Sequence, residues 1–447
     1  MAKQFGRLNW TILLLFGLVG QIAWTVENMY FNLFVYDTVA KDLDTVTLMV
    51  QLSGVVATVA TLLAGTVADK IGNRRTFLCV GYAVWGVTVA LFGMLSPSLT
   101  QSLFGVDLQK AITITLAAVV VGDCVMTLFG STANDAAFNA WVTDNTESEY
   151  RGGVEGVLSI LPLAAMLIVA GGFGILVQAI GYSTLFLILG AVISLCGVAG
   201  LFFVKDSPNL QKSGEFKDIF YGFKPSVIKQ NKSLYLTLLL VGVYGIACQI
   251  FMPYLIIYMK EYLGFNELEY SAVFAVAILA GAALNVYFTR LSDRKDKVKM
   301  LYFAVAVLAA GLLGMYLSKG FGKMGDLIVF GIFGFVMITG YILVSALCGS
   351  TVRDLTPTQA VGKLQGVRMV FSVLIPMLVG PMIGNAINAA RNIPLPDLES
   401  ADVMTTQYIP APEIFLAAAL MALVMLAIIP LLQKTMKKEK ERGEIEN

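Results

Sequence analysis

The sequence contains no histidine, no glycine-rich phosphate loop ending in Gly-Lys-Ser/Thr, and no HExxH metal pattern. Nucleotide hydrolysis and zinc-dependent proteolysis depend on these groups, so neither activity is expected. The missing histidine also removes a common proton-relay residue, which leaves carboxylates to carry any coupled protons. We therefore predict a protein that is not an enzyme and that needs no cofactor.

Cysteine is also scarce, with five residues in a chain of 447. None of them forms a Cys-x-x-Cys pair or a metal-ligand spacing, and all lie within apolar segments: Cys79, Cys124, Cys196, Cys248 and Cys348. We interpret them as small core residues, so that neither a disulfide nor a metal site is predicted.

Charged residues make up only 14% of the chain, far below the roughly 25% of soluble domains. The net charge is +1, which gives no reason to expect a nucleic-acid partner. Hydrophobic residues make up 57% of the chain, and the mean hydropathy is +0.77. A soluble chain of this length could not bury so much apolar surface, so lipid is the expected solvent.

Apolar runs recur from Leu8 to Leu432 with only short polar breaks. At a helical rise of about 1.5 Å per residue, each run is long enough to cross a hydrocarbon core of about 30 Å. The runs therefore predict an all-α polytopic membrane protein with twelve spanning helices. The expected spans are residues 8–36, 45–68, 76–95, 112–141, 153–178, 183–204, 234–260, 269–290, 299–318, 326–350, 364–389 and 412–432.

Lysine and arginine are distributed unevenly over the predicted loops. If the N-terminus is cytoplasmic, 6 of the 31 basic residues fall outside, namely Lys41, Lys110, Lys260, Lys319, Lys323 and Arg391. The positive-inside rule then predicts that both termini are cytoplasmic and that the protein lies in the cell membrane. The basic start, Met1 to Leu8, leads into a run longer than a signal peptide, so we expect it to remain as part of the first helix.

Two segments of the chain repeat each other at an offset of 210 residues. Residues 144–146, 152 and 155–157 (Asp-Asn-Thr, Gly and Glu-Gly-Val) recur as residues 354–356, 362 and 365–367 (Asp-Leu-Thr, Gly and Gln-Gly-Val). The repeat predicts two pseudo-symmetric six-helix bundles with a binding site near mid-membrane. The expected division is residues 1–204, an amphipathic linker at 205–233, residues 234–433, and a charged tail at 434–447.

The loop after the second predicted helix, residues 65–75, reads Gly-Thr-Val-Ala-Asp-Lys-Ile-Gly-Asn-Arg-Arg. It resembles the G-x-x-x-D-R/K-x-G-R-R signature of the major facilitator superfamily, which implies that fold. By this resemblance Asp69, Gly72, Arg74 and Arg75 serve the conformational cycle. Read from the residues alone, the same charges could simply set the topology.

Residues 134–144, followed by Arg151 and Gly152, are similar to the glycoside-pentoside-hexuronide:cation symporters, the branch of the melibiose carrier. Melibiose carriers have acidic residues one turn apart on their second helix as part of a sodium site. The second helix here has no carboxylate before Asp69, so a sodium site of that type lacks its ligands on this helix.

Four carboxylates fall inside predicted spans: Glu27, Asp123, Asp135 and Glu155. Placing a charged carboxylate within a span costs at least about 2.5 kcal/mol, so we expect each of the four to have a functional or structural role. Glu27 and Asp123 lie at nearly the same depth on helices that, by the resemblance, line a central cavity. We predict that they bind the coupling ion or the solute, because burial beside a like charge favours proton uptake. The alternatives are a structural hydrogen bond and a water-filled vestibule.

Asp135 and Glu155 lie toward the predicted cytoplasmic end, across the repeat from Arg368, which is the only basic residue assigned to a span. Charge pairs of this kind could form an inner gate that closes in one state and opens in the other. A permanent structural ion pair would explain them equally well. Arg368 could instead meet an anionic solute.

Neutral polar and aromatic residues also occur in the predicted cavity helices, and Trp24, Asn28 and Tyr254 are the candidates for solute contacts. Amides, hydroxyls and flat rings suit a neutral polyhydroxy solute, although tyrosine and tryptophan also form membrane-interface belts. The prediction is a monomeric secondary transporter of a sugar or glycoside coupled to H⁺ or Na⁺. The alternative is a proton-coupled exporter of drugs or metabolites.

Overall fold

The computed structural model describes residues 6–146, 151–208, 216–292, 297–357, 364–395 and 408–442. These residues form helices and one pair of two-residue strands, and they divide into two compact units. Unit 1 contains the described residues up to Phe216, and unit 2 contains those from Lys217 onward.

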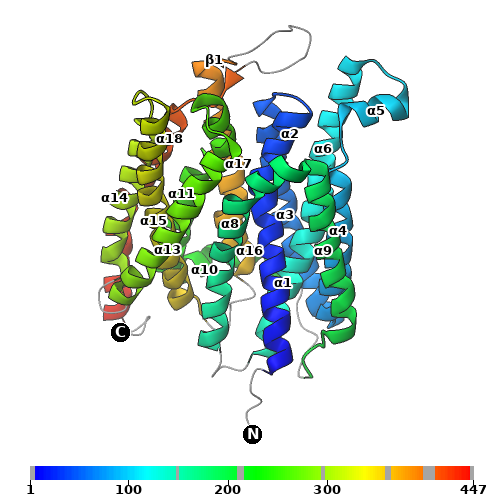
Figure 1. The fold of residues 1–447 in the computed structure, drawn as a ribbon. Helices are drawn as coiled ribbons and strands as arrows, with labels where there is room; N and C mark the ends of the chain where they lie inside the picture. The colour runs from blue at the N-terminus through cyan, green and yellow to red at the C-terminus, as the bar shows by residue number, and fades with distance from the viewer. Residues whose placement is uncertain are drawn as a thin grey trace. The chain divides into compact units, whose positions relative to one another are not determined.

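Unit 1 is a bundle of long helices that lie side by side (Figure 1). Its elements are α1 (Arg7–Val26), η1 (Glu27–Phe31), α2 (Asn32–Thr38), α3 (Leu43–Ile71), α4 (Arg74–Phe92), α5 (Pro97–Phe104), α6 (Leu108–Gly130), η2 (Ser131–Phe138), α7 (Asn139–Asn145), α8 (Arg151–Ile180) and α9 (Tyr182–Phe203).

Unit 2 begins at the 3₁₀ segment η3 (Phe216–Phe223), which contains the boundary between the units. Its other elements are α10 (Pro225–Gln230), α11 (Lys232–Gln249), η4 (Met252–Tyr254), α12 (Leu255–Ile257), η5 (Tyr258–Tyr262), α13 (Glu267–Ser292), α14 (Lys297–Tyr316), α15 (Lys323–Leu355), α16 (Gln365–Met369), η7 (Val370–Leu374), α17 (Ile375–Arg391), β1 (Ile393–Pro394), β2 (Tyr408–Ile409) and α18 (Glu413–Glu441).

Within the described residues, twelve helices are long and apolar enough to cross a membrane, six in each unit. This confirms the predicted fold class and number of spans. The helix α18 continues beyond the expected last span, residues 412–432, through the charged segment to Glu441. The short helix α5, in the loop between the third and fourth spans, was not predicted.

Hydrogen bonds that the sequence itself provides define the turn between α3 and α4. Gly72 ends α3 in the left-handed conformation, with φ of 72°, and its N–H donates to the carbonyl of Ala68 at 2.9 Å. Glycine is the residue that adopts this conformation without steric cost. Asn73 then caps α4 by accepting the N–H of Thr76 at 2.9 Å, so the chain reverses within two residues.

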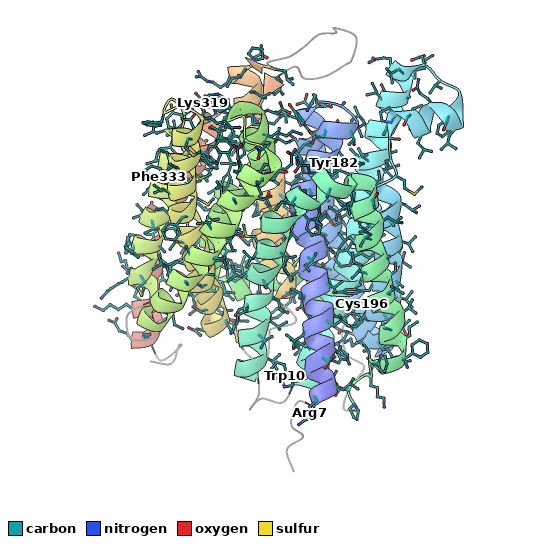
Figure 2. All side chains as sticks on the ribbon, in the orientation of Figure 1. Arg7, Trp10, Tyr182, Cys196, Lys319 and Phe333 are labelled. Atoms are coloured by element: carbon teal, nitrogen blue, oxygen red, sulfur yellow. The ribbon has the colours of Figure 1, made fainter. Side chains whose placement is uncertain are left out.

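Close packing between α4 and α9 forms a large part of the unit 1 core. A Cβ atom on Gly86 of α4 would lie 2.3 Å from the carbonyl oxygen of Gly190 on α9, so the two backbones are in contact there. At one end of unit 1, Tyr182 donates to Asp37 Oδ2 at 2.8 Å. Figure 2 shows Tyr182 at the opposite end of the unit from Arg7.

Several spans are interrupted by short π-helical segments: η1, η2, η5 and η7. Each such segment contains an extra residue per turn and rotates the side chains that follow it relative to a straight α-helix. Three of these segments contain a carboxylate: Glu27 in η1, Asp135 in η2 and Glu261 in η5. Segments of this kind are frequent at functional sites.

The later part of the expected linker packs with unit 2. Val227 on α10 is buried in an apolar cluster with Leu234, Leu238, Val352, Leu364 and Val367. Tyr235 on α11 donates its hydroxyl to the carbonyl of Gly222, which holds η3 against the start of the first span of this unit.

Candidate functional site

Glu27 lies where α1 passes into η1, and 8% of its surface is exposed. Its Oε1 atom accepts a hydrogen bond of 2.8 Å from the Thr127 hydroxyl on α6. Its Oε2 atom is buried and has no hydrogen-bond partner among the described residues. A buried carboxylate oxygen without a donor is costly, so this atom is a candidate ligand for a proton or a cation.

Asp123 lies on α6, one helical turn before Thr127, and is 2% exposed. Its carboxylate interacts with the Ser53 hydroxyl on α3 and electrostatically with Glu27. The two carboxylates that the sequence predicted at one depth are therefore neighbours. The carboxylate pair and the two hydroxyls beside it come from three spans. Glu27 lies on the first span, Ser53 on the second, and Asp123 and Thr127 on the fourth.

Asp135 is the third carboxylate of this region and lies on η2. It accepts a hydrogen bond of 3.3 Å from Asn134 Nδ2, and it interacts electrostatically with Glu27. The Trp24 indole N–H and the Ser131 hydroxyl lie near it, although neither completes a hydrogen bond with a described residue. Asp135 thus lies close to the Glu27 pair, whereas the sequence assigned it to an inner gate.

Aromatic rings form one wall beside these carboxylates. The rings of Trp24 and Trp85 are 5.2 Å apart, and those of Tyr82 and Trp85 are 5.5 Å apart at nearly a right angle. The Tyr82 hydroxyl lies 2.8 Å from Asn134 Oδ1. Gly20 permits this arrangement, because a Cβ atom there would lie 2.4 Å from both the Tyr82 hydroxyl and Asn134 Oδ1.

No lysine or arginine forms an ion pair with Glu27, Asp123 or Asp135 in the part of the chain that the structure describes. Three adjacent carboxylates within apolar spans cannot all remain charged without a counter-ion or a proton. The cluster can therefore take up positive charge. It provides carboxylate and hydroxyl oxygens as the groups that would hold it.

The loop signature forms a second cluster at the end of α3. The Arg74 guanidinium forms an ion pair with Asp69 and donates from Nε to Asp144 Oδ2 at 3.0 Å. Arg75 donates to the carbonyl of Leu201. Asp206 Oδ1 accepts the backbone N–H groups of Arg74 and Arg75 at 3.0 and 2.9 Å, and so binds the N-terminus of α4.

Unit 2 repeats part of this cluster. Lys297, the first residue of α14, pairs with Asp354 near the end of α15 at 2.7 Å. Arg74 is likewise the first residue of α4, and Asp144 lies near the end of α7. The pairs Arg74–Asp144 and Lys297–Asp354 therefore link corresponding helices in the two units.

A family model described as the Major Facilitator Superfamily matches residues 13–381. The chain belongs to the major facilitator superfamily. It is accordingly a membrane transporter, and the match confirms the resemblance that the loop signature indicated. The match does not distinguish branches of the superfamily.

Solved structures share the fold of this superfamily member at low sequence identity. A mutant of the nucleoside transporter NupG is 12% identical, with 94% of this chain and 99% of that chain covered and a TM-score of 0.65. A bacterial homolog of the human lysosomal transporter Spinster, inward-facing and unoccupied, is 13% identical, with coverage of 96% and 97% and a TM-score of 0.64. No curated protein sequence matches the chain.

The other predicted residues of this superfamily member lie in varied surroundings. Asn28 is exposed, and its Nδ2 atom donates to the carbonyl of Trp24 at 2.7 Å. Tyr254 of unit 2 is fully buried, and its hydroxyl donates to the carbonyl of Pro381 at 3.0 Å, so it joins η4 to α17. Arg368 is half-buried on α16 in unit 2. The side chain of Glu155 lies outside the described residues.

The sequence did not predict two of the residues described above, Thr127 beside Glu27 and Asp206 in the loop-signature cluster. Thr127 lies four residues after Asp123, and this spacing alone indicates a shared helix face. Asp206 follows the last helix of unit 1 and is more than 130 residues from the N–H groups that it binds. No local pattern marks that contact, because it depends on how α9 packs against α4.

Proposed function

We propose that the protein is a cation-coupled secondary transporter in which Glu27 and Asp123 bind the coupling ion. The observation that carries the proposal is the buried Glu27 Oε2 atom, which has no hydrogen-bond partner among the described residues. A proton bound to this atom would neutralise the Glu27 carboxylate and remove its repulsion from the Asp123 carboxylate. Na⁺ would find oxygen ligands in the two carboxylates and in the hydroxyls of Ser53 and Thr127.

We further propose that the solute is small, polar and rich in hydroxyl groups, as a sugar or glycoside is. The Trp24 ring beside the carboxylates supports this proposal, because a flat ring with adjacent hydrogen-bonding groups suits such solutes. NupG is named as a nucleoside transporter, and a nucleoside carries a ribose of the same chemical kind. We expect the transporter to act as a monomer in the cell membrane, within the cation symporter branch.

Glu27→Gln and Asp123→Asn test the coupling site. Each variant removes one ionisable group and keeps its size, so uphill uptake into proteoliposomes is expected to fall at least about tenfold, the effect of about 1.4 kcal/mol of lost coupling. Exchange of solute without an ion gradient should persist. Uptake is measured from pH 5 to pH 9, with and without Na⁺, so that the ion whose gradient drives accumulation is identified.

The matched control is Asp326→Asn, because Asp326 is equally buried but lies in unit 2, where it accepts the N–H groups of Gly320 and Phe321. It should accumulate solute like the wild type. Undiminished accumulation in both Glu27→Gln and Asp123→Asn would overturn the proposal. Thermal-shift measurements with sugars, nucleosides and lipophilic cations select the solute, and stabilisation by the lipophilic cations alone would identify an exporter.

A further inference from the structure

A cavity of about 720 Å³ opens in unit 2, and all of its lining residues belong to that unit. The first turn of α14, the last turn of α15 and the last two turns of α18 line it. Its charged lining residues are Lys297, Lys299, Lys437, Lys440, Asp354 and Glu441. Four lysines face two carboxylates, so the cavity carries a net charge of two positive units.

The spacing of the lining residues shows that α18 presents one face to this cavity. Gln433, Met436, Lys437, Lys440 and Glu441 follow the i, i+3, i+4, i+7, i+8 pattern of a single helix face. Lys434 and Lys438 lie on the same helix end and are equally exposed, but they do not line the cavity. The lysines of the tail are therefore divided into two sets by position.

One ion pair already occupies part of the lining. Lys297 Nζ lies 2.7 Å from Asp354 Oδ2, so these two charges largely neutralise each other. The remaining carboxylate, Glu441, faces three lysines. Lys437 and Lys440 on α18 therefore supply the positive charge on which the site depends.

The cavity lies at the end of the apolar part of α18. It begins at Gln433, directly after the last buried apolar residue of α18, Leu432. Val298, Leu355 and Met436 contribute apolar surface to the same lining. A basic cavity with apolar walls at the end of a span matches a phosphate group attached to a glycerol and acyl chains.

We infer that this cavity binds the phosphate-bearing headgroup of an anionic phospholipid. The phosphate accepts hydrogen bonds from Lys437 and Lys440, and the acyl chains extend along the apolar part of the span. The inference does not depend on the coupling site, because no residue of the cavity belongs to unit 1. Binding weakens as salt concentration rises, since the contacts are partly exposed to water.

The test is a titration of the purified full chain in detergent with dioctanoyl phosphatidylglycerol, with bound lipids counted by native mass spectrometry. Lys437→Gln combined with Lys440→Gln leaves the cavity neutral and is expected to raise the dissociation constant about 30-fold, at about 1 kcal/mol per lysine. The control is Lys434→Gln combined with Lys438→Gln, which removes the same charge from outside the cavity. It should change the dissociation constant less than about threefold.

Dioctanoyl phosphatidylcholine, whose headgroup has no net charge, should bind at least about tenfold more weakly. Equal weakening by the two double variants, or equal binding of the two lipids, would overturn the inference. Inorganic phosphate is the arm that distinguishes the source of the anion. If it displaces the lipid at an equal concentration, the ligand is a soluble phosphate and the lipid assignment is wrong.

Discussion

At the scale of single residues, Thr127 is the group that orients the proposed ion ligand. Its hydroxyl donates to Glu27 Oε1, which leaves Oε2 as the atom without a donor. A hydrogen bond to a charged group contributes about 1.5–3 kcal/mol, and it stabilises the ionised form of the acceptor.

Thr127→Val removes the donor and keeps the shape of the side chain. Because the ionised carboxylate loses its hydrogen bond, we expect the midpoint of the pH profile of uptake to rise by about one pH unit or more. Thr127→Ser keeps the hydroxyl and should retain the wild-type midpoint. An unchanged profile in Thr127→Val, measured in the same proteoliposomes, would contradict a positioning role for this residue.

The sequence predicted the Glu27–Asp123 neighbourhood because depth in a membrane can be counted at about 1.5 Å per residue. It did not predict that Asp135 would lie beside the Glu27 pair. Asp135 is inside η2, and a π-helical segment rotates the following side chains away from their places on a straight α-helix. Tyr254 shows another limit, because sequence alone does not reveal that its hydroxyl is bound to Pro381.

At the scale of helices, the two units use the same ion pair with different burial. Arg74 is 8% exposed and bridges Asp69 and Asp144, whereas Lys297 is 36% exposed and, among the described residues, pairs with Asp354. Buried, doubly bound cations contribute more than exposed ones, because solvent screens the latter. Although the two ion pairs occupy repeated positions in the sequence, we therefore expect them to contribute unequally to the free energy of unfolding.

Arg74→Gln should lower the free energy of unfolding by about 2 kcal/mol, since two carboxylates lose their partner. Lys297→Gln, at the matching position of unit 2, should lower it by less than about 1 kcal/mol. Denaturation of the two variants in the same detergent gives both values. Equal losses would show that burial does not separate the two pairs.

The twelve spans were predictable because long apolar runs leave the backbone few alternatives in lipid. Their interruptions were not, since η1 and η7 contain no proline or glycine that would mark a break. The boundary at Gly72 was readable from sequence, as glycine followed by an asparagine cap is a helix stop and start.

At the scale of the whole molecule, the two halves repeat the same scaffold but differ in chemistry. The described buried carboxylates of the mid-spans, Glu27 and Asp123, belong to unit 1, and the basic cavity belongs to unit 2. The pairs Arg74–Asp144 and Lys297–Asp354 belong to the shared scaffold. The proposed ion site and the proposed lipid site are thus additions to different copies of one helical unit.

The last prediction concerns the orientation of the molecule in the membrane. Of the 31 lysines and arginines, only six fall on the side that would be outside, and moving one span would carry a basic cluster outward. A fluorescent protein fused after Asn447 should therefore be bright, and alkaline phosphatase at that position should be inactive. Both reporters inserted after Gly105, beyond α5, should give the opposite result.

The same orientation bears on the basic cavity. Lys437 and Lys440 would then lie at the cytoplasmic leaflet, whose anionic lipids attract lysine clusters that follow a span. If the reporters gave the reverse pattern, the positive-inside distribution would be violated over the entire chain, and the lysines of α18 would lie at the outer leaflet. Phosphatidylglycerol binding in detergent does not depend on orientation, so the two measurements together distinguish an intrinsic lipid site from charges that only determine topology.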